Sequence, residues 1–163
     1  MKKVLLLLIV AFAIIQFFPI DKTNPPVDKA KDFLTLRKTP QDIAQLIRAS
    51  CYDCHSNETQ YPWYAKIQPV AWYLKDHIDE GREEFNFSEF ANYEPLRQAK
   101  KMRKSAHEIE EGEMPMESYT LIHQNAKLTP EQKQQLQAYF TSVKETIMQE
   151  NNISEEQMKR KKH

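Results

Sequence analysis

The chain has 163 residues, of which 23 are Lys or Arg and 23 are Asp or Glu, so its formal net charge at pH 7 is zero. This balance argues against a nucleic-acid binder, which normally carries a basic excess. Only two glycines, Gly81 and Gly112, occur, and so few of them suit an all-α fold of one small domain with few tight hairpins.

The N-terminus has the pattern of an export signal. Lys2 and Lys3 precede an apolar run over residues 4–20 that only Gln16 interrupts, and a basic start before an apolar segment is typical of such signals. Residues 1–20 are predicted to be an uncleaved signal anchor, because a run of about 17 residues just reaches the lower limit for spanning a bilayer. A cleaved signal is the alternative. Since the positive end stays inside, we expect an inner-membrane protein of the bacterial cell envelope with its domain in the periplasm.

Residues 21–38 are predicted to form a linker. Asn24-Pro25-Pro26 cannot be helical, because each proline forces the residue before it into an extended conformation. One globular domain is expected over residues 39–150, with its first helix starting at Thr39-Pro40, an N-cap followed by a proline at the first helical position. Apolar side chains at i, i+3 and i+4 follow and lead directly to the next motif; they are Ile43, Leu46 and Ile47.

Cys51-Tyr52-Asp53-Cys54-His55 is a Cys-x-x-Cys-His motif, the attachment signature of a c-type haem. On one turn of helix its three functional side chains share a face, so the two thiols can join the haem vinyl groups while His55 reaches the iron. A thioredoxin-type pair would need a preceding strand, and a structural zinc site would need four ligands. A chance match on a surface helix is the third alternative. We predict one haem c, held by Cys51, Cys54 and His55.

Two further candidates follow this motif. Trp63 lies in the aromatic cluster Tyr61-Pro62-Trp63-Tyr64 and either forms a wall over the haem or packs in an ordinary core. A second helix is predicted over residues 68–80, with Gly81 as its C-terminal cap. At about 100° per residue His77 lies on the apolar face of this helix. We therefore expect His77 to be a hydrogen-bonded core residue, a partner of a haem propionate or the sixth iron ligand.

A third helix is predicted over residues 95–112, after a polar–aromatic turn at residues 86–90. By the same angular count of about 100° per residue Arg103 falls inside the apolar arc, where it needs an anionic partner such as a haem propionate. The opposite arc is basic and forms either a solvated face or a docking patch for an acidic redox partner. It carries Arg97, Lys100, Lys101 and Lys104.

Met114 follows this helix and precedes a proline. A thioether there suits the sixth iron position, because it favours ferrous iron and raises the potential. The chain between His55 and Met114 is long enough to cross to the opposite haem face. Met116 is the competing thioether, and core packing of both methionines is the plainer alternative. Ligation by His77 or His107 would give bis-histidine iron instead.

The last helix has the clearest start. Thr129-Pro130-Glu131-Gln132 combines an N-cap, a proline at N1 and a Thr-x-x-Gln capping box. Its apolar stripe is predicted to pack on the helix that leads into Cys51. Residues 151–163 form a polar, basic tail that we expect to be frayed or disordered.

Several of these segments together resemble a family of small bacterial haem-binding domains in exported, membrane-anchored proteins. They are Asn24-Pro25-Pro26-Val27, Cys51-Tyr52-Asp53-Cys54-His55-Ser56-Asn57, Tyr61-Pro62-Trp63-Tyr64, Asp76-His77-Ile78-Asp79-Glu80-Gly81-Arg82, Asn86-Phe87-Ser88 and Gly112-Glu113-Met114-Pro115. The resemblance covers about residues 20–147 and implies a cytochrome c-like helical domain wrapped around one covalent haem. Met116 stands where the family pattern has a second proline, so two thioethers compete.

The sequence therefore predicts a single-electron carrier with one haem c and no reaction of its own. Its expected partners are an unidentified redox protein and, through the N-terminal helix, a membrane. The rival hypothesis is a haem-based sensor or peroxidase-like enzyme with an open sixth site, in which His77 or Arg103 lies over the iron. A module that holds a non-haem metal through two thiols is the third hypothesis.

Overall fold

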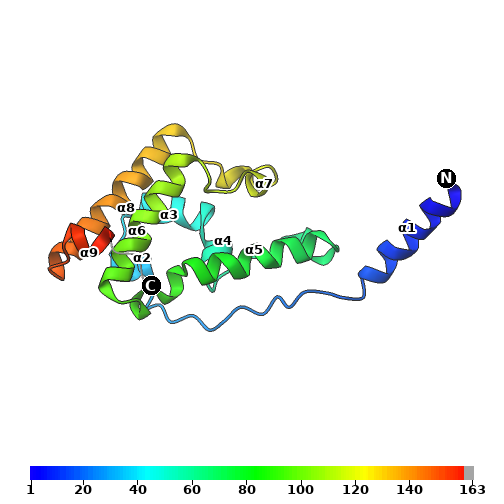
Figure 1. The fold of residues 1–163 in the computed structure, drawn as a ribbon, viewed down its shortest axis with the longest axis horizontal. Helices are drawn as coiled ribbons and strands as arrows, with labels where there is room; N and C mark the ends of the chain where they lie inside the picture. Colours follow the sequence, from blue (N-terminus) through cyan, green and yellow to red (C-terminus); the bar gives the residue numbers. More distant parts are fainter. Residues whose placement is uncertain (160–163) are drawn as a thin grey trace.

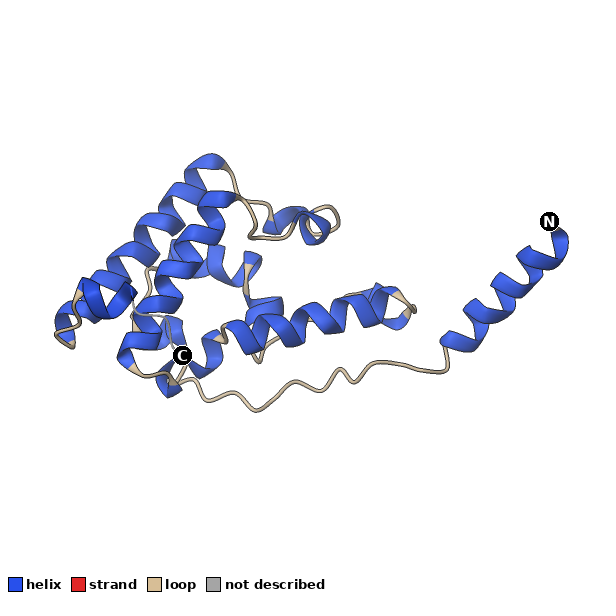
Figure 2. Ribbon diagram, viewed as in Figure 1, coloured by secondary structure: helices blue, strands red, loops and turns tan. Residues whose placement is uncertain are grey.

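The computed structural model describes residues 1–159. Within this range the backbone forms helices and loops with no β-strand, which confirms the all-α prediction (Figures 1 and 2). The elements are α1 (Lys2–Ile15), α2 (Phe33–Leu36), α3 (Gln41–Ser50), α4 (Tyr52–His55), η1 (Trp63–Lys66), α5 (Val70–Glu84), η2 (Phe87–Asn92), α6 (Pro95–Glu111), α7 (Glu117–Thr120), η3 (Gln124–Ala126), α8 (Pro130–Glu150) and α9 (Glu155–Lys159).

The long helices α6 and α8 lie side by side and carry much of the core (Figure 1). Helix α8 buries one face because its apolar residues recur three and four positions apart; these are Leu136, Phe140, Val143 and Ile147. Helix α3 also packs against α8, as predicted. An aromatic cluster extends the core toward α2 and η2, where the ring centroids of Phe33 and Phe90 lie 4.9 Å apart, edge to face, an arrangement that aromatic quadrupoles favour.

Two predicted helix boundaries are confirmed. The Thr129 hydroxyl accepts a hydrogen bond from the Gln132 backbone N–H (3.2 Å), and the Gln132 side chain accepts one from the Thr129 N–H (2.9 Å), which completes the capping box of α8. At the C-terminal end of α6, Gly112 has φ of 80°, the left-handed conformation that glycine adopts without a Cβ clash. Both signals are local, so the sequence alone predicts them.

The structure contradicts the predicted membrane anchor. Across residues 1–159 we find no helix with both the length and the apolar character needed to cross a membrane. Helix α1 has 14 residues and is therefore about 21 Å long, against a hydrocarbon core of about 30 Å. Beyond it, the Gln16 side chain bonds the backbone N–H (2.9 Å) and C=O (3.1 Å) of Gln68. The predicted inner-membrane anchor with a periplasmic domain is therefore wrong, because no described helix can cross a membrane.

The predicted linker and tail also differ from the structure. Helix α2 lies inside residues 21–38, and its Phe33 is fully buried, so the end of this segment belongs to the domain. Asp32 caps α2 by accepting from the Leu34 N–H (3.0 Å). In the tail, α9 packs on α6 and buries Met158. The remaining four residues of the predicted tail, 160–163, lie outside the described residues.

Candidate haem site

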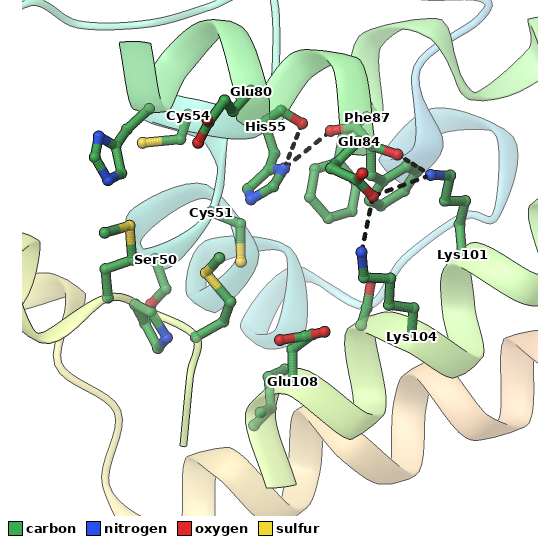
Figure 3. A pocket seen from close by; sticks show the side chains of 18 of the residues that line it. Ser50, Cys51, Cys54, His55, Glu80, Glu84, Phe87, Lys101, Lys104 and Glu108 are labelled. Carbon is green, nitrogen blue, oxygen red and sulfur yellow. Dashed lines mark hydrogen bonds and ion pairs between the residues drawn. The ribbon is translucent and has the colours of Figure 1, made fainter. Parts of the chain in front are cut away.

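A largely apolar cavity opens between α5, α6 and the loop that follows α6, and the Cys-x-x-Cys-His motif forms one wall of it (Figure 3). Cys51, Cys54 and His55 all line this cavity, and both cysteines are free. Its other lining residues include Phe85, Phe87, Ile109, Phe140, Met114, Met116, His77, Glu80, Glu84, Lys101, Lys104, Glu108 and Tyr119. An apolar cleft with a few convergent polar groups is the usual form of a cofactor site.

His55 is fixed in the tautomer that an iron ligand requires. Its Nδ1 lies 2.8 Å from the Gly81 carbonyl oxygen and 3.0 Å from the Phe85 carbonyl oxygen. Carbonyl oxygens only accept, so Nδ1 carries the proton and Nε2 keeps its lone pair. Figure 3 shows the ring turned into the cavity with both bonds on the α5 side. Burial lowers the pKa of His55, against the opposing effect of the two carbonyls, and this favours the neutral imidazole.

The two thiols are held in the protonated form. Burial raises the pKa of Cys51 to about 12, with a smaller contribution from the neighbouring Cys54. Burial also raises the pKa of Cys54 to about 11, and Asp53 adds to the rise. Reactive redox cysteines have lowered pKa values, so these thiols do not match the thioredoxin-type alternative. Within residues 1–159 no group of three or more His, Cys, Asp or Glu is arranged to hold a metal ion, which leaves the zinc alternative without a ligand set.

Gly81 lets the motif approach α5. A Cβ built at Gly81 would lie 2.8 Å from the Cys54 carbonyl oxygen and 3.3 Å from the Cys54 Cβ, so no side chain fits between the two helices. The sequence predicted Gly81 as a helix cap, but α5 continues one turn further to Glu84. The glycine is required by a tertiary contact, and this contact puts the Gly81 carbonyl within reach of His55.

A polar network holds the loop that follows the motif, and the sequence analysis did not identify it. The Arg82 guanidinium donates to the Ser56 carbonyl (2.8 Å), the Asn24 side chain (2.7 Å) and the Thr59 hydroxyl (2.8 Å). Asn24 in turn donates to the Thr59 carbonyl (2.9 Å). This network ties residues 24–26 to α5 and to the motif loop. Asn24, Ser56 and Arg82 belong to the segments that carry the family resemblance, and this was the available signal in the sequence.

A second layer of the network uses Asn57. Its side chain donates to the Pro26 carbonyl (3.0 Å) and accepts from the Asn86 side chain (2.7 Å), and its backbone N–H donates to the Ser88 hydroxyl (3.1 Å). Asn57, Asn86 and Ser88 are buried, where unpaired polar groups would be costly. The contacts therefore fix the loop beside His55 in one position.

Met114 and Met116 both line the cavity. The loop that carries them is held at two points. The Met114 N–H donates to the Glu108 carbonyl (3.1 Å), and the Tyr119 hydroxyl donates to the Asp53 carboxylate (2.6 Å), inside the Cys-x-x-Cys-His motif. The segment from Met114 to Tyr119 and the cysteine motif therefore line the same cavity and are joined by a direct hydrogen bond.

The remaining candidate residues divide between the cavity and the exposed surface. Trp63 is 71% exposed and does not line the cavity, because the short η1 turn buries the adjacent Tyr64 instead. Arg103 is also exposed, since α8 covers a neighbouring arc of α6 and leaves Arg103 outside it. His77 lines the cavity, and its Nδ1–H donates to the Tyr73 carbonyl (2.8 Å). His107 is 62% exposed beside acidic residues of α6 and is not among the lining residues.

These features define a helical haem-binding protein: a histidine, two thiols and two methionine thioethers line one largely apolar cavity. The model of the haem-binding domain family matches residues 10–142, and the chain belongs to that family. Comparison with curated proteins and with solved structures gives no match. The family match supports haem as the cofactor of this cavity.

Proposed function

We infer that the chain binds one haem covalently through Cys51 and Cys54 and carries single electrons. The observation that carries this proposal is the position of His55, whose Nδ1–H is committed to two backbone carbonyls while Nε2 faces the cavity that both thiols line. A metal-ligating histidine usually donates a hydrogen bond from the ring nitrogen that does not bind the metal, and this bond orients the ring.

The covalent step requires two free thiols, which Cys51 and Cys54 supply. Each Cys S–H would add across a vinyl C=C bond of haem: the sulfur would bond to one carbon, the hydrogen would go to the other, and the double bond would become single. No atom leaves, and no oxidant is consumed. When bound, haem supplies an iron that changes between the ferric and ferrous states. The chain holds the ligands in place and shields the iron from water.

Met114 is the proposed sixth ligand. It follows directly on α6, and its backbone is held by the bond to the Glu108 carbonyl. Met116 lies two residues further toward α7 in the same cavity wall. If Met114 and His55 together hold the iron, no position is left open for a substrate, so the proposed electron carrier has no reaction of its own. The exposure of His107 favours the thioether over that histidine.

The test is an absorption spectrum of the full chain, produced in a host that attaches haem to Cys-x-x-Cys-His motifs. We expect a low-spin haem with a thioether–iron charge-transfer band in the ferric form and no response of the ferrous form to carbon monoxide. A high-spin or gas-binding haem would contradict the electron-carrier proposal and support the haem-based sensor or peroxidase-like enzyme.

A further inference from the structure

Two lysines of α6 face the cavity beside an acidic residue of α5. Lys101 and Lys104 both line the cavity. The Lys104 ammonium lies 2.8 Å from the Glu84 carboxylate, the Lys101 ammonium lies 3.8 Å from it, and Lys101 also contacts the Glu84 backbone carbonyl. Figure 3 shows these lysines on the far side of His55 from Cys54. The basic arc predicted as a solvated or docking face is therefore turned, at these two positions, toward the cofactor site.

The local charges are unbalanced in favour of an anion. Two ammonium groups share one carboxylate, and the Lys101 side chain is only 16% exposed. Its burial lowers the pKa of Lys101, while Glu84 opposes that effect. Burying an ammonium group without enough partners is unfavourable. The other carboxylates on the cavity wall, Glu80 and Glu108, make no ion pair with either lysine among the described contacts of residues 1–159.

Haem brings two carboxylates of its own, and its propionate edge is opposite its vinyl edge. If Cys51 and Cys54 hold the vinyl edge, the propionates point away from the cysteines. Among residues 1–159, Lys101 and Lys104 are the only Lys or Arg side chains that line the cavity. The Glu84 side chain is 60% exposed, so it can turn to solvent when other carboxylates replace it.

We propose that Lys101 and Lys104 form the binding site for the haem propionates, with Glu84 as the carboxylate they bind when haem is absent. This inference rests on the proposed haem function. It transfers the propionate role from Arg103, which is exposed on the same helix.

The test compares haemin with haemin dimethyl ester, which has the same ring without the two negative charges. The full-length apoprotein is titrated with each, as the wild type, as Lys101→Gln/Lys104→Gln and as Arg103→Gln, and Soret absorbance reports binding. We expect the wild type to prefer haemin by about tenfold or more, since charge-assisted hydrogen bonds are among the stronger polar contacts. The double variant should lose most of that preference, and Arg103→Gln, which removes one charge from the same helix, should keep it.

A wild type that binds both compounds equally, or a double variant that keeps the full preference, overturns the propionate site and leaves haem binding intact. A wild type that binds neither compound overturns haem binding itself. If circular dichroism shows that the double variant is unfolded, Lys104→Gln alone carries the test, because the Lys104 side chain is half exposed and tolerates substitution. It should lose part of the preference, and an unchanged preference counts against the proposal.

Discussion

The contact between Gly81 and Cys54 gives the sharpest prediction, because two opposite effects can be weighed. Gly81→Ala gains about 1 kcal/mol of helix propensity within α5. The new Cβ would lie 2.8 Å from the Cys54 carbonyl oxygen, and overpacking of this kind costs about 1–3 kcal/mol. Moving α4 outward also weakens the His55 bond to the Gly81 carbonyl, which is worth about 1 kcal/mol. We expect a net destabilisation of about 1–3 kcal/mol and a perturbed haem spectrum.

Denaturant unfolding of the full chain measures the stability, and the absorption spectrum of the haem-loaded protein measures the ligation. Gly112→Ala is the matched control. Its φ of 80° strains any side chain, but a Cβ there meets only the end of Lys133 at 3.9 Å. This variant should lose about 1–2 kcal/mol of stability without changing the spectrum. A Gly81→Ala protein as stable as the wild type, with an unchanged spectrum, would refute the reasoning.

Three further predictions concern the two walls of the cavity. Met114→Ala should let the ferrous haem bind carbon monoxide, whereas Met116→Ala should not. The reverse result would identify Met116, in place of Met114, as the sixth ligand. Tyr119→Phe removes the hydrogen bond between Tyr119 and Asp53 of the cysteine motif, so denaturant unfolding should show a loss of about 1 kcal/mol of stability. An unchanged stability would show that this bond does not stabilise the fold. Because burial raises the pKa of Cys51 to about 12 and of Cys54 to about 11, the folded apoprotein keeps protons that the unfolded chain loses, so its stability should fall as the pH rises above about 9. Denaturant midpoints from about pH 8 to about pH 11 check this slope, which Cys51→Ala/Cys54→Ala should flatten.

The sequence predicts the parts of this protein that depend on neighbouring residues. The capping box at Thr129 and the end of the third helix at Gly112 depend only on residues close by in the chain, and the structure confirms both. The spacing inside the cysteine motif likewise predicts that Cys51, Cys54 and His55 share one wall of a cavity.

Features decided by distant segments were not predictable in the same way. The angular count placed Arg103 in an apolar arc, but only the position of α8 decides which arc is covered. Asn24 meets Arg82 across 58 positions of chain, and no periodicity reports such a pairing. Phe33 lies in a four-residue helix, too short to show an amphipathic pattern, so its segment was interpreted as a linker. The N-terminal run of apolar residues predicted a longer helix than α1 because composition alone does not show where a helix ends.

The most direct test of the account is the intact mass of the full chain produced with a haem-attachment system. We predict a gain of one haem that persists in denaturant and is absent from the Cys51→Ala/Cys54→Ala variant. A colourless protein, or haem that separates from the unfolded chain, would contradict covalent attachment through this motif.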